Sequence, residues 1–305
     1  MKPMLGKTKM STQSGGRPPA AIELSAEGVL GAALDSSTSE PVFAFAPLPP
    51  GALVPGIAEP NIRNAELVAG AIRSALNGMS LRSRSVTVVL PDSSVRVFML
   101  DFDSLPSRPA EVLPVLRLRM RKMVPFDVEH AGISYQTLSQ SGSAFRLLTA
   151  ILPGPVLAEF ETAVRAAGYD PGAVLPSSLA ALEVVDSMEA VLTANLSPLA
   201  LTTSITNGSD LLLHRTLDLP EDPHERLADI QRGIAVAAAY YEDTLRAPAR
   251  EIQYAGCYKS SEFAKWISSM ELKVVDLVQR PETGVINSLG NASIAGVSGA
   301  LAGTK

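Results

Sequence analysis

The chain has 305 residues, of which 46% are hydrophobic, and a formal net charge of −5. This length and composition suffice for a large core and favour two domains, and the acidic balance excludes the basic signature of a nucleic-acid-binding protein. The single cysteine, Cys257, excludes an internal disulfide and a cysteine-cluster metal site, and it is typical of a reducing compartment. No apolar run in the sequence reaches the roughly 18 residues that a membrane-spanning helix needs.

The first segment, residues 1–20, is rich in Ser, Thr, Gly and Pro and carries basic residues without an acidic one. It lacks the apolar stretch of a secretory signal. Its composition predicts a disordered, solvated tail with almost nothing to bury. Contact of its cations with an anionic membrane surface is the less favoured alternative.

The next segment predicts a meander of three short strands followed by a helix. The strands are expected at residues 21–24, 28–34 and 42–46, where apolar residues lie between turn signals. After a proline-rich loop, residues 64–77 carry apolar side chains at the spacing of an amphipathic helix, which Asn77 and Gly78 end.

The middle of the chain alternates strands with two helices. Its strands are expected at residues 86–90, 95–102, 133–138 and 145–152, and its helices at residues 111–124 and 156–167. Pro125 ends the first helix because it disfavours helical geometry at Val124 and lacks an amide donor. Gly168 is expected to cap the second helix in the left-handed conformation that glycine tolerates.

The first of these helices is strongly basic near its end, where it carries Arg117, Arg119, Arg121 and Lys122. The helix dipole favours cations at this position. Arg117 and Arg121, however, repel each other at i, i+4 spacing unless a partner neutralises them. A solvated face and a contact with an acidic partner are both open interpretations.

The remaining residues predict a second meander and a series of helices and strands. They are expected as a strand at 173–175, a helix at 177–188, strands at 190–195, 200–206 and 210–217, a long helix at 223–246, a strand at 252–255, a helix at 260–270, a strand at 273–277 and a helix of small residues at 292–302. The second meander echoes the first, which indicates an internal repeat. His214 lies in this meander and is interpreted as a strand residue that faces polar surroundings.

Two stretches carry a resemblance to a known family. They contain Leu105-Pro106, Leu116, Pro125-Phe126, Glu129 and Tyr135, and then Ala167-Gly168, Pro171, Val174, Pro176 and Ser178-Leu179-Ala180. The order of these elements resembles the PilM family of type IV pilus assembly proteins, over roughly residues 20–303. That family is similar to the cell-division protein FtsA and belongs to the actin-like ATPase superfamily.

The resemblance implies an α/β protein of mixed sheets with an actin-like (ribonuclease H-like) two-lobe fold, a small inserted SHS2-like domain and a reduced second lobe. The expected parts are a tail at 1–20, a first lobe at 21–85 and 173–190, an inserted domain at 86–172 and a second lobe at 191–305 that lacks most of its extra subdomain. The helix at 292–302 is expected to pack back on the first lobe.

The resemblance also locates the loops that would hold a nucleotide. Actin-like ATPases use two Asp-x-Gly turns, in which the carboxylate orders Mg²⁺ and the glycine lets backbone amides approach phosphates. The corresponding positions are Glu23 and Ser25 in the first turn, Asn195 and Ser197 in the second, and Gly256 in the adenosine loop. Such degenerate motifs predict no catalytic residues, no enzyme activity, no metal site and no ATP–Mg²⁺ cofactor; weak residual nucleotide binding is the less favoured alternative.

As a PilM-like protein, the chain is expected to be a cytoplasmic adaptor that binds the N-terminal segment of a PilN-like inner-membrane protein and reaches the membrane through that partner only. The pilus motor ATPases, which drive twitching motility, are a further candidate partner, and nucleic acid is not expected to be one. The family's groove lies between the first lobe and the inserted domain. The candidate contacts there are Val68, Ala71, Ile72, Val97, Gly168 and Leu179.

Two other classes compete with the adaptor. An actin-fold ATPase or kinase would need intact Asp-x-Gly turns, which the sequence lacks. A structural component of the GspL kind would need a membrane span, and an FtsA-like filament protein would need an amphipathic C-terminal helix that residues 281–305 do not predict.

Overall fold

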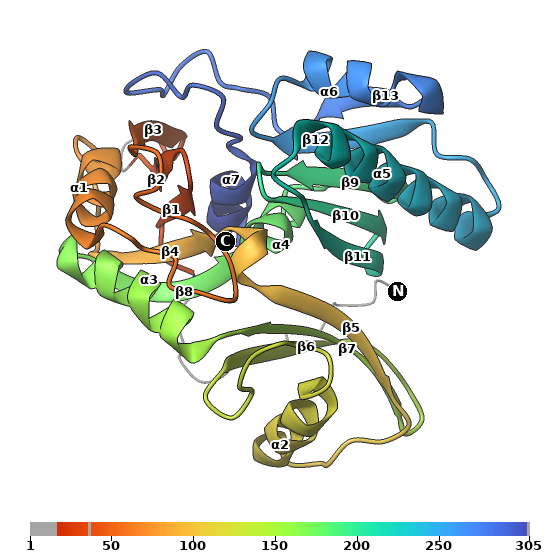
Figure 1. Ribbon diagram of the computed structural model, residues 1–305. Helices are drawn as coiled ribbons and strands as arrows, with labels where there is room; N and C mark the ends of the chain where they lie inside the picture. Colours follow the sequence, from red (N-terminus) through yellow and green to blue (C-terminus); the bar gives the residue numbers. More distant parts are fainter. Residues whose placement is uncertain (1–16, 36–37, 304–305) are drawn as a thin grey trace.

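The computed structural model describes residues 17–35 and 38–303, which form two five-stranded mixed sheets and one three-stranded sheet (Figure 1). The first sheet has the strand order β3-β2-β1-β4-β8. Its strands are β1 (Ala20–Ser25), β2 (Gly28–Leu34), β3 (Pro41–Pro47), β4 (Ser85–Leu90) and β8 (Asp170–Pro176). The strands β1, β2 and β3 pair antiparallel, whereas β4 and β8 add in parallel.

Helices cover both faces of the first sheet because its strands are apolar on both sides. These helices are α1 (Ala65–Leu76), α3 (Gly154–Ala166), α4 (Ser177–Leu182) and α7 (Ala295–Ala302). Ile22 and Leu24 of β1 face a core shared with α1 and α3. Ala21 of the same strand faces the other side, where it packs in a cluster with Val297 of α7 and Ala180 of α4.

The second sheet repeats the arrangement of the first, with the order β11-β10-β9-β12-β13. Its strands are β9 (Ala190–Leu196), β10 (Ala200–Asn207), β11 (Asp210–Asp218), β12 (Glu251–Gly256) and β13 (Lys273–Asp276), and its helices are α5 (Pro223–Leu245) and α6 (Ser260–Trp266). Again a three-strand antiparallel meander is followed by two parallel strands. The expected internal repeat is therefore confirmed.

The third sheet is inserted into the first lobe and has the order β5-β7-β6. It consists of β5 (Arg96–Phe102), β6 (Gly132–Ser141) and β7 (Ala144–Leu152), with α2 (Pro109–Met120) on one face. Leu116 and Met120 of α2 pack there against Leu147 and Ile151 of β7. We call β5, α2, β6 and β7 the insert.

The insert is shorter than the expected inserted domain of residues 86–172. The strand β4, expected to begin that domain, belongs to the first sheet, and so does the whole of β8. Helix α3 also belongs to the first lobe, since Phe160 and Val164 are buried in its core. The apolar run at β4 looks the same in the sequence whichever sheet it joins, and only the parallel pairing with β1 decides its place.

Several predicted elements end in different places. Helix α2 ends at Met120, before a turn that leads to Pro125, and α4 ends at Leu182 although helix was predicted to 188. In the second case, Ser187 accepts a hydrogen bond from the amide of Glu189 and forms a local turn that competes with helix. The helix expected at 260–270 is divided into α6 and a 3₁₀ turn at Ser268–Met270, and α7 begins only at Ala295.

The tail predicted at residues 1–20 includes residues that belong to the first lobe. Residues 1–16 lie outside the described part of the chain, but Ala20 is the first residue of β1 and is buried. Arg17 forms an ion pair with Glu183. Within residues 17–35 and 38–303, no helix combines the length and the apolar character needed to cross a bilayer.

Candidate functional site

A cavity of about 380 Å³ lies where the two lobes meet. We call it the inter-lobe cleft. It brings together all five positions that the sequence assigned to the degenerate nucleotide loops: Glu23, Ser25, Asn195, Ser197 and Gly256. They converge because β1 and β9 hold the same place in the two sheets, so that their end turns face each other across the lobe boundary.

Asp92 links the two lobes at the floor of this cleft. It follows β4, is buried, and accepts four hydrogen bonds. Its Oδ1 accepts from the amide and the hydroxyl of Ser178, at 3.0 and 2.9 Å, and its Oδ2 accepts from Asn195 Nδ2 and Thr202 Oγ1, at 3.2 and 2.8 Å. Burial raises the pKa of Asp92, and the four hydrogen bonds oppose that rise. Both oxygens are therefore already engaged by the protein itself.

Glu23 lies between α4 and the start of α7. Its Oε1 accepts a hydrogen bond from Ser177 Oγ at 2.6 Å, and this hydroxyl accepts one from Asn195 Nδ2 at 3.1 Å. Its Oε2 is buried against the start of α7, next to Gly296 and the backbone of Val297. The pKa of Glu23 is raised to about 7, mainly by burial and also by the nearby Asp92, while hydrogen bonds from Ser177 and the Val297 backbone lower it.

His214 extends the polar network away from the cleft. Its ring is buried, with Nδ1 at 2.9 Å from Ser204 Oγ and Nε2 at 3.4 Å from Ser178 Oγ. Burial lowers the pKa of His214 to about 4, so the ring is neutral at physiological pH. The prediction of a strand residue in polar surroundings is confirmed, and the structure adds that the side chain is buried.

The sequence analysis assigned no role to Asp92. It also missed the part played by Ser177, Ser178 and Thr202. A signal was present, because Asp92 follows a strand whose residues are apolar almost throughout. In a parallel arrangement the carboxyl ends of strands meet at one edge of a sheet, and polar residues there converge.

The charges and ligands in the cleft lining bear on whether a Mg²⁺–nucleotide complex could bind there. None of its described lining residues is Lys or Arg, while Glu23, Glu27 and Asp92 all line it. Asp92 has no free oxygen for a metal, and in the described ranges no three His, Cys, Asp or Glu side chains form a group that could hold one. Burial also raises the pKa of the Cys257 thiol to about 12, which excludes a reactive thiolate.

A second cavity, of about 390 Å³, lies between the insert and both lobes. We call it the insert groove. One wall is the face of the three-stranded sheet opposite α2, where the cross-strand pairs Ser134–Ala150 and Gln136–Leu148 lie. The others are β8 with α4 and the hairpin between β10 and β11, and they include Val174, Leu175, Pro176, Leu179, Leu182, Thr206 and Leu211.

Two sheet edges face this groove. The strand β6 is the edge of the insert's sheet, and β8 is the edge of the first sheet. Residues of both strands line the cavity, among them Tyr135 and Leu138 of β6 and Val174 of β8. An edge strand offers unpaired backbone N–H and C=O groups to another extended segment.

Only one of the six predicted partner contacts lines the insert groove. Leu179 lines the insert groove. Val68, Ala71 and Ile72 are buried in the first-lobe core, at 0, 7 and 0% exposed, so their prediction as groove residues is wrong. The apolar stripe of α1 packs against the first sheet and does not line the groove.

The other two predicted contacts also lie outside the lining of the groove. Val97 packs against the first-lobe core. Gly168 has φ of +90°, as expected for a helix cap, but it precedes β8, whereas the groove is lined by the other end of that strand. Its carbonyl accepts a hydrogen bond from Arg84.

Two of the four basic residues at the end of α2 make contacts within the insert. Arg117 donates to the carbonyls of Val128 and Ala131, and Arg121 forms an ion pair with Glu129. These contacts fix the loop between α2 and β6. They favour a structural interpretation of Arg117 and Arg121 over contact with an acidic partner, whereas Arg119 and Lys122 stay open to either interpretation.

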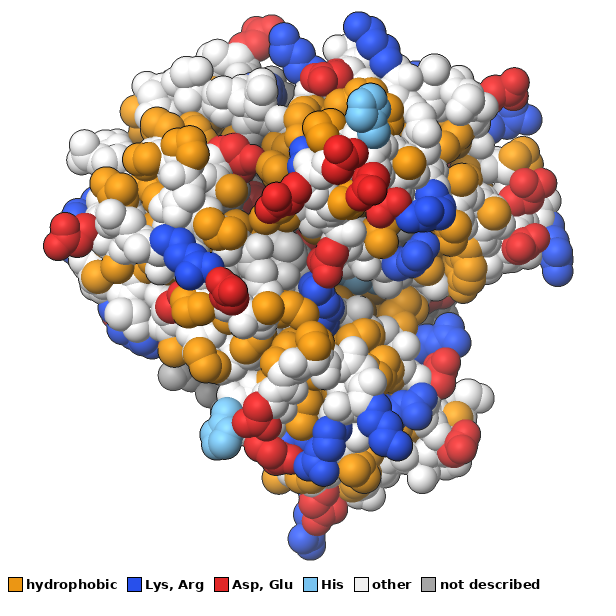
Figure 2. Space-filling view, viewed as in Figure 1, with side chains coloured by type: hydrophobic (Ala, Val, Ile, Leu, Met, Phe, Trp, Pro, Cys, Tyr) orange, Lys and Arg blue, Asp and Glu red, His pale blue; other side chains and the backbone are white. Residues whose placement is uncertain are grey.

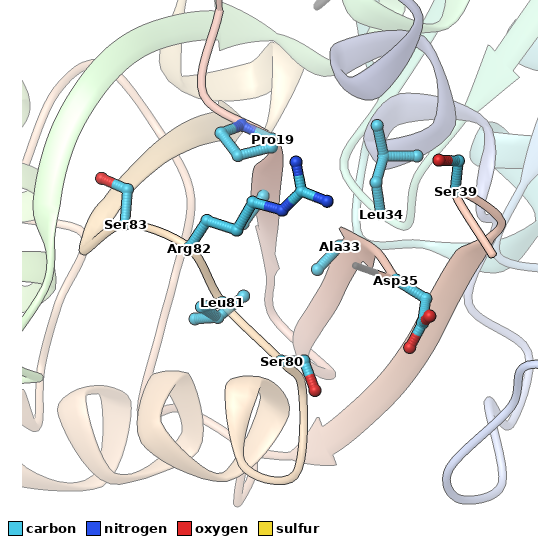
Figure 3. A pocket seen from close by; sticks show the side chains of 10 residues that line it. Pro19, Ala33, Leu34, Asp35, Ser39, Ser80, Leu81, Arg82 and Ser83 are labelled. Atoms are coloured by element: carbon cyan, nitrogen blue, oxygen red, sulfur yellow. The ribbon is translucent and has the colours of Figure 1, made fainter. Parts of the chain in front are cut away.

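A third cavity is too small to hold an organic ligand. Figure 3 shows it between Pro19, the end of β2 and the loop before β4, with the Arg82 side chain extending into it. Its volume is about 90 Å³, which is room for a few water molecules.

Comparison with known proteins identifies the fold. No protein-family model and no curated protein sequence matches the chain. A solved structure described as the PilM-PilN type IV pilus biogenesis complex matches with a TM-score of 0.71 and 16% identity, covering 94% of this chain and 99% of that chain. The chain is thus structurally similar to PilM in that complex.

Two further solved structures match more weakly. One is the cytoplasmic domain of EpsL, an inner-membrane component of the type II secretion system of Vibrio cholerae, with a TM-score of 0.49 and 13% identity over 87% of this chain and 89% of that one. The other is a Bacteroides thetaiotaomicron protein with an actin-like ATPase fold and unknown function, with a TM-score of 0.48 and 10% identity over 86% of this chain and 91% of that one. The predicted actin-like α/β fold with mixed sheets is confirmed.

Proposed function

We propose that this chain, an actin-like protein similar in structure to PilM, is an adaptor of a type IV pilus or related secretion platform. It binds a short segment of a PilN-like membrane protein in the insert groove. It acts at the cytoplasmic face of the inner membrane and reaches the membrane through that partner. The observation that carries the proposal is the meeting of two sheet edges and apolar walls in one cavity.

The backbone of the groove supports an extended ligand. A peptide strand laid beside β6 gains main-chain hydrogen bonds, as in other cases of strand addition. Alternate side chains of that strand then point toward the groove. Because Leu148, Val174 and Leu179 provide apolar contact surface there, we expect the bound segment to carry two or three apolar residues.

The charges in the groove are balanced. Arg17 and Glu183 both line it and pair with each other at 2.9 Å. Such a partly exposed pair contributes little to binding a charged ligand. The groove therefore selects for shape and apolar side chains, and a segment that orders on binding is expected to have micromolar affinity, about 8 kcal/mol.

The test is a titration of the full chain with a labelled peptide from the N-terminus of the membrane protein encoded beside it. Gln136→Trp fills the groove from an exposed position and is expected to weaken binding at least tenfold, about 1.4 kcal/mol. Gln140→Trp is the matched control, since Gln140 is exposed on the same strand and does not line the groove. Absence of binding by folded wild type, or equal loss in both variants, would count against the adaptor.

We also infer that the chain does not hydrolyse ATP. The support is the cleft's lack of basic lining residues and the engagement of both Asp92 oxygens by the protein. Phosphate release should stay at background with Mg²⁺ present. Metal-dependent turnover that Glu23→Ala abolishes would contradict this inference.

A further inference from the structure

We propose that the insert groove is a docking site for the chain's own N-terminal segment, residues 1–16, which adds as a strand to the free edge of β6. These residues lie outside the described part of the chain. The docking stands apart from the adaptor function, and only its consequence, competition with the partner segment, rests on that function. The proposal combines the free edge, the place where the segment joins the folded body, and the alternation in its sequence.

The free edge of β6 is open to the groove. Ser134, Tyr135 and Gln136 are consecutive residues of β6, and all three line the cavity. Because successive side chains of a strand point to opposite faces, a cavity lined by three consecutive residues lies along the edge of the strand. No other strand of the described sheet pairs with this edge, so its N–H and C=O groups can pair with an added strand.

The groove leaves apolar side chains partly exposed. They are Leu138, Leu148, Val174, Leu175, Leu179, Leu182, Val185 and Leu211. In Figure 2, apolar side chains, drawn in orange, lie along the junction where the insert meets the lobes above it. Because removing such surface from water is favourable, an apolar segment laid over it is stabilised there.

The N-terminal segment joins the folded body at the groove. Arg17, the first described residue, itself lines the cavity. The next residue, Pro18, lies against Gly172 of β8, the edge strand of the first sheet. The chain that leads into β1 therefore starts at the groove and passes β8. Residues 13–16 can reach at most about 14 Å from Arg17, and they end in two glycines that permit a sharp turn.

Residues 4–12 present two different faces when they are extended. One face consists of Met4, Gly6, Thr8, Met10 and Thr12, and the other of Leu5, Lys7, Lys9 and Ser11. The first face is uncharged and carries two methionines, whose flexible side chains fill irregular apolar space. A strand added to β6 can turn this face to the groove and both lysines away from it. Composition alone predicts a solvated tail, whereas this alternation predicts a strand where an edge is available.

The charges near the groove suit a cationic segment. Asp186 and Asp210 are exposed, and each adjoins a lining residue in the sequence. Residues 1–16 carry three lysines and no acidic residue. Opposite charges steer a segment toward its site, but exposed pairs contribute little to affinity. The uncharged face of the segment therefore supplies the specificity.

Docking within one chain needs only weak affinity. A segment on a short linker has an effective concentration of about 1 mM. With a dissociation constant of about 100 μM, it occupies the groove about 90% of the time, which weakens a competing segment about tenfold. The same occupancy slows hydrogen exchange of the newly paired amides of β6 about tenfold.

The first experiment measures hydrogen exchange of the full chain without any partner. Met4→Asp/Met10→Asp places charge on the face that docks and should raise the exchange rate of those β6 amides that do not pair with β7, about tenfold. Leu5→Asp/Ser11→Asp adds the same charge to the other face and is the matched control. Its exchange rates should stay within about twofold of wild type.

The second experiment titrates the same three proteins with the labelled peptide of the neighbouring membrane protein. Met4→Asp/Met10→Asp should bind the peptide about tenfold more tightly than wild type, and the control variant should bind it like wild type. Equal affinity of all three proteins would overturn the competition. If none of them binds the peptide, the adaptor function fails, whereas a difference in hydrogen exchange still supports docking of the segment.

Two results of the exchange measurement would overturn the docking. One is an unchanged rate at the β6 amides in Met4→Asp/Met10→Asp, and the other is an equal increase in both variants. The measurement is repeated at a tenfold lower protein concentration. Protection that falls on dilution would assign the bound segment to a second copy of the chain and would overturn docking within one chain.

Discussion

The inter-lobe cleft and the insert groove have almost the same volume, about 380 and 390 Å³, but they arise in different ways. The cleft lies where the two copies of the repeated sheet face each other, and buried polar side chains fix its floor. The groove exists because a three-stranded sheet is inserted beside the edge of β8. The repeat determines where the first cavity lies, and the insertion creates the second.

The connections across the two cavities also differ in strength. Asp92 joins the lobes through buried hydrogen bonds to Ser178, Asn195 and Thr202. The insert meets the second lobe where β5 packs against β11 and where Arg96 pairs with Asp218, which is largely exposed. We therefore expect the lobes to be held more firmly at the cleft than the insert is held at the groove.

The largest expected effect comes from Asp92→Ala. Its four donors would lose their acceptor inside the protein, which should lower the free energy of unfolding by about 3–4 kcal/mol. Asp101→Ala is the control, because the Asp101–Arg146 pair is exposed and should contribute less than about 1 kcal/mol. Urea unfolding of both variants measures the difference, and a loss below 1 kcal/mol for Asp92→Ala would remove the contrast between the cavities.

The next effect is a gain in stability in Glu23→Gln that depends on pH. The folded-state pKa of Glu23, about 7, exceeds the model-compound value of 4.5, so the native state binds more protons between these values and wild-type stability falls as pH rises through them. Gln does not titrate, and the variant should be more stable at pH 8 by up to about 3 kcal/mol, but not at pH 4. Unfolding at both pH values tests this, and an advantage that does not grow with pH would contradict it.

Arg96→Ala is expected to act on the insert groove. Loss of its pair with Asp218 should cost about 1 kcal/mol of stability and loosen the insert against β11. Peptide affinity should fall about threefold, as titration of the labelled peptide measures. Unchanged peptide affinity would show that this pair does not hold the groove in place.

The smallest effect is expected for Arg17→Ala at the groove. The Arg17–Glu183 pair is partly exposed, so the free energy of unfolding should change by less than about 1 kcal/mol. Glu183→Ala should give the same result, and the double variant should be no worse than either single one. A loss above 2 kcal/mol would mean that Arg17 has a structural part beyond this pair.

The sequence predicted the elements of both lobes well where a strong period was present. The long helix expected at 223–246 is observed as Pro223–Leu245, and each of the two meanders is observed as three strands. Errors occurred at helix ends, as in α4, where local side-chain hydrogen bonds compete with the helix. The role of α1 was also wrongly predicted. Its apolar stripe shows that one face is buried, but it does not show whether that face packs on a sheet or lines a groove.

The sequence by itself determined the positions of the two loops that meet at the cleft, since each is a turn after a strand and each can be recognised locally. Only the tertiary structure decided the chemistry between them. The donors to Asp92 come from Ser178, Asn195 and Thr202, which are 86, 103 and 110 residues away along the chain. No local pattern encodes such contacts, because they depend on how two sheets, each stable through its own core, come to face each other.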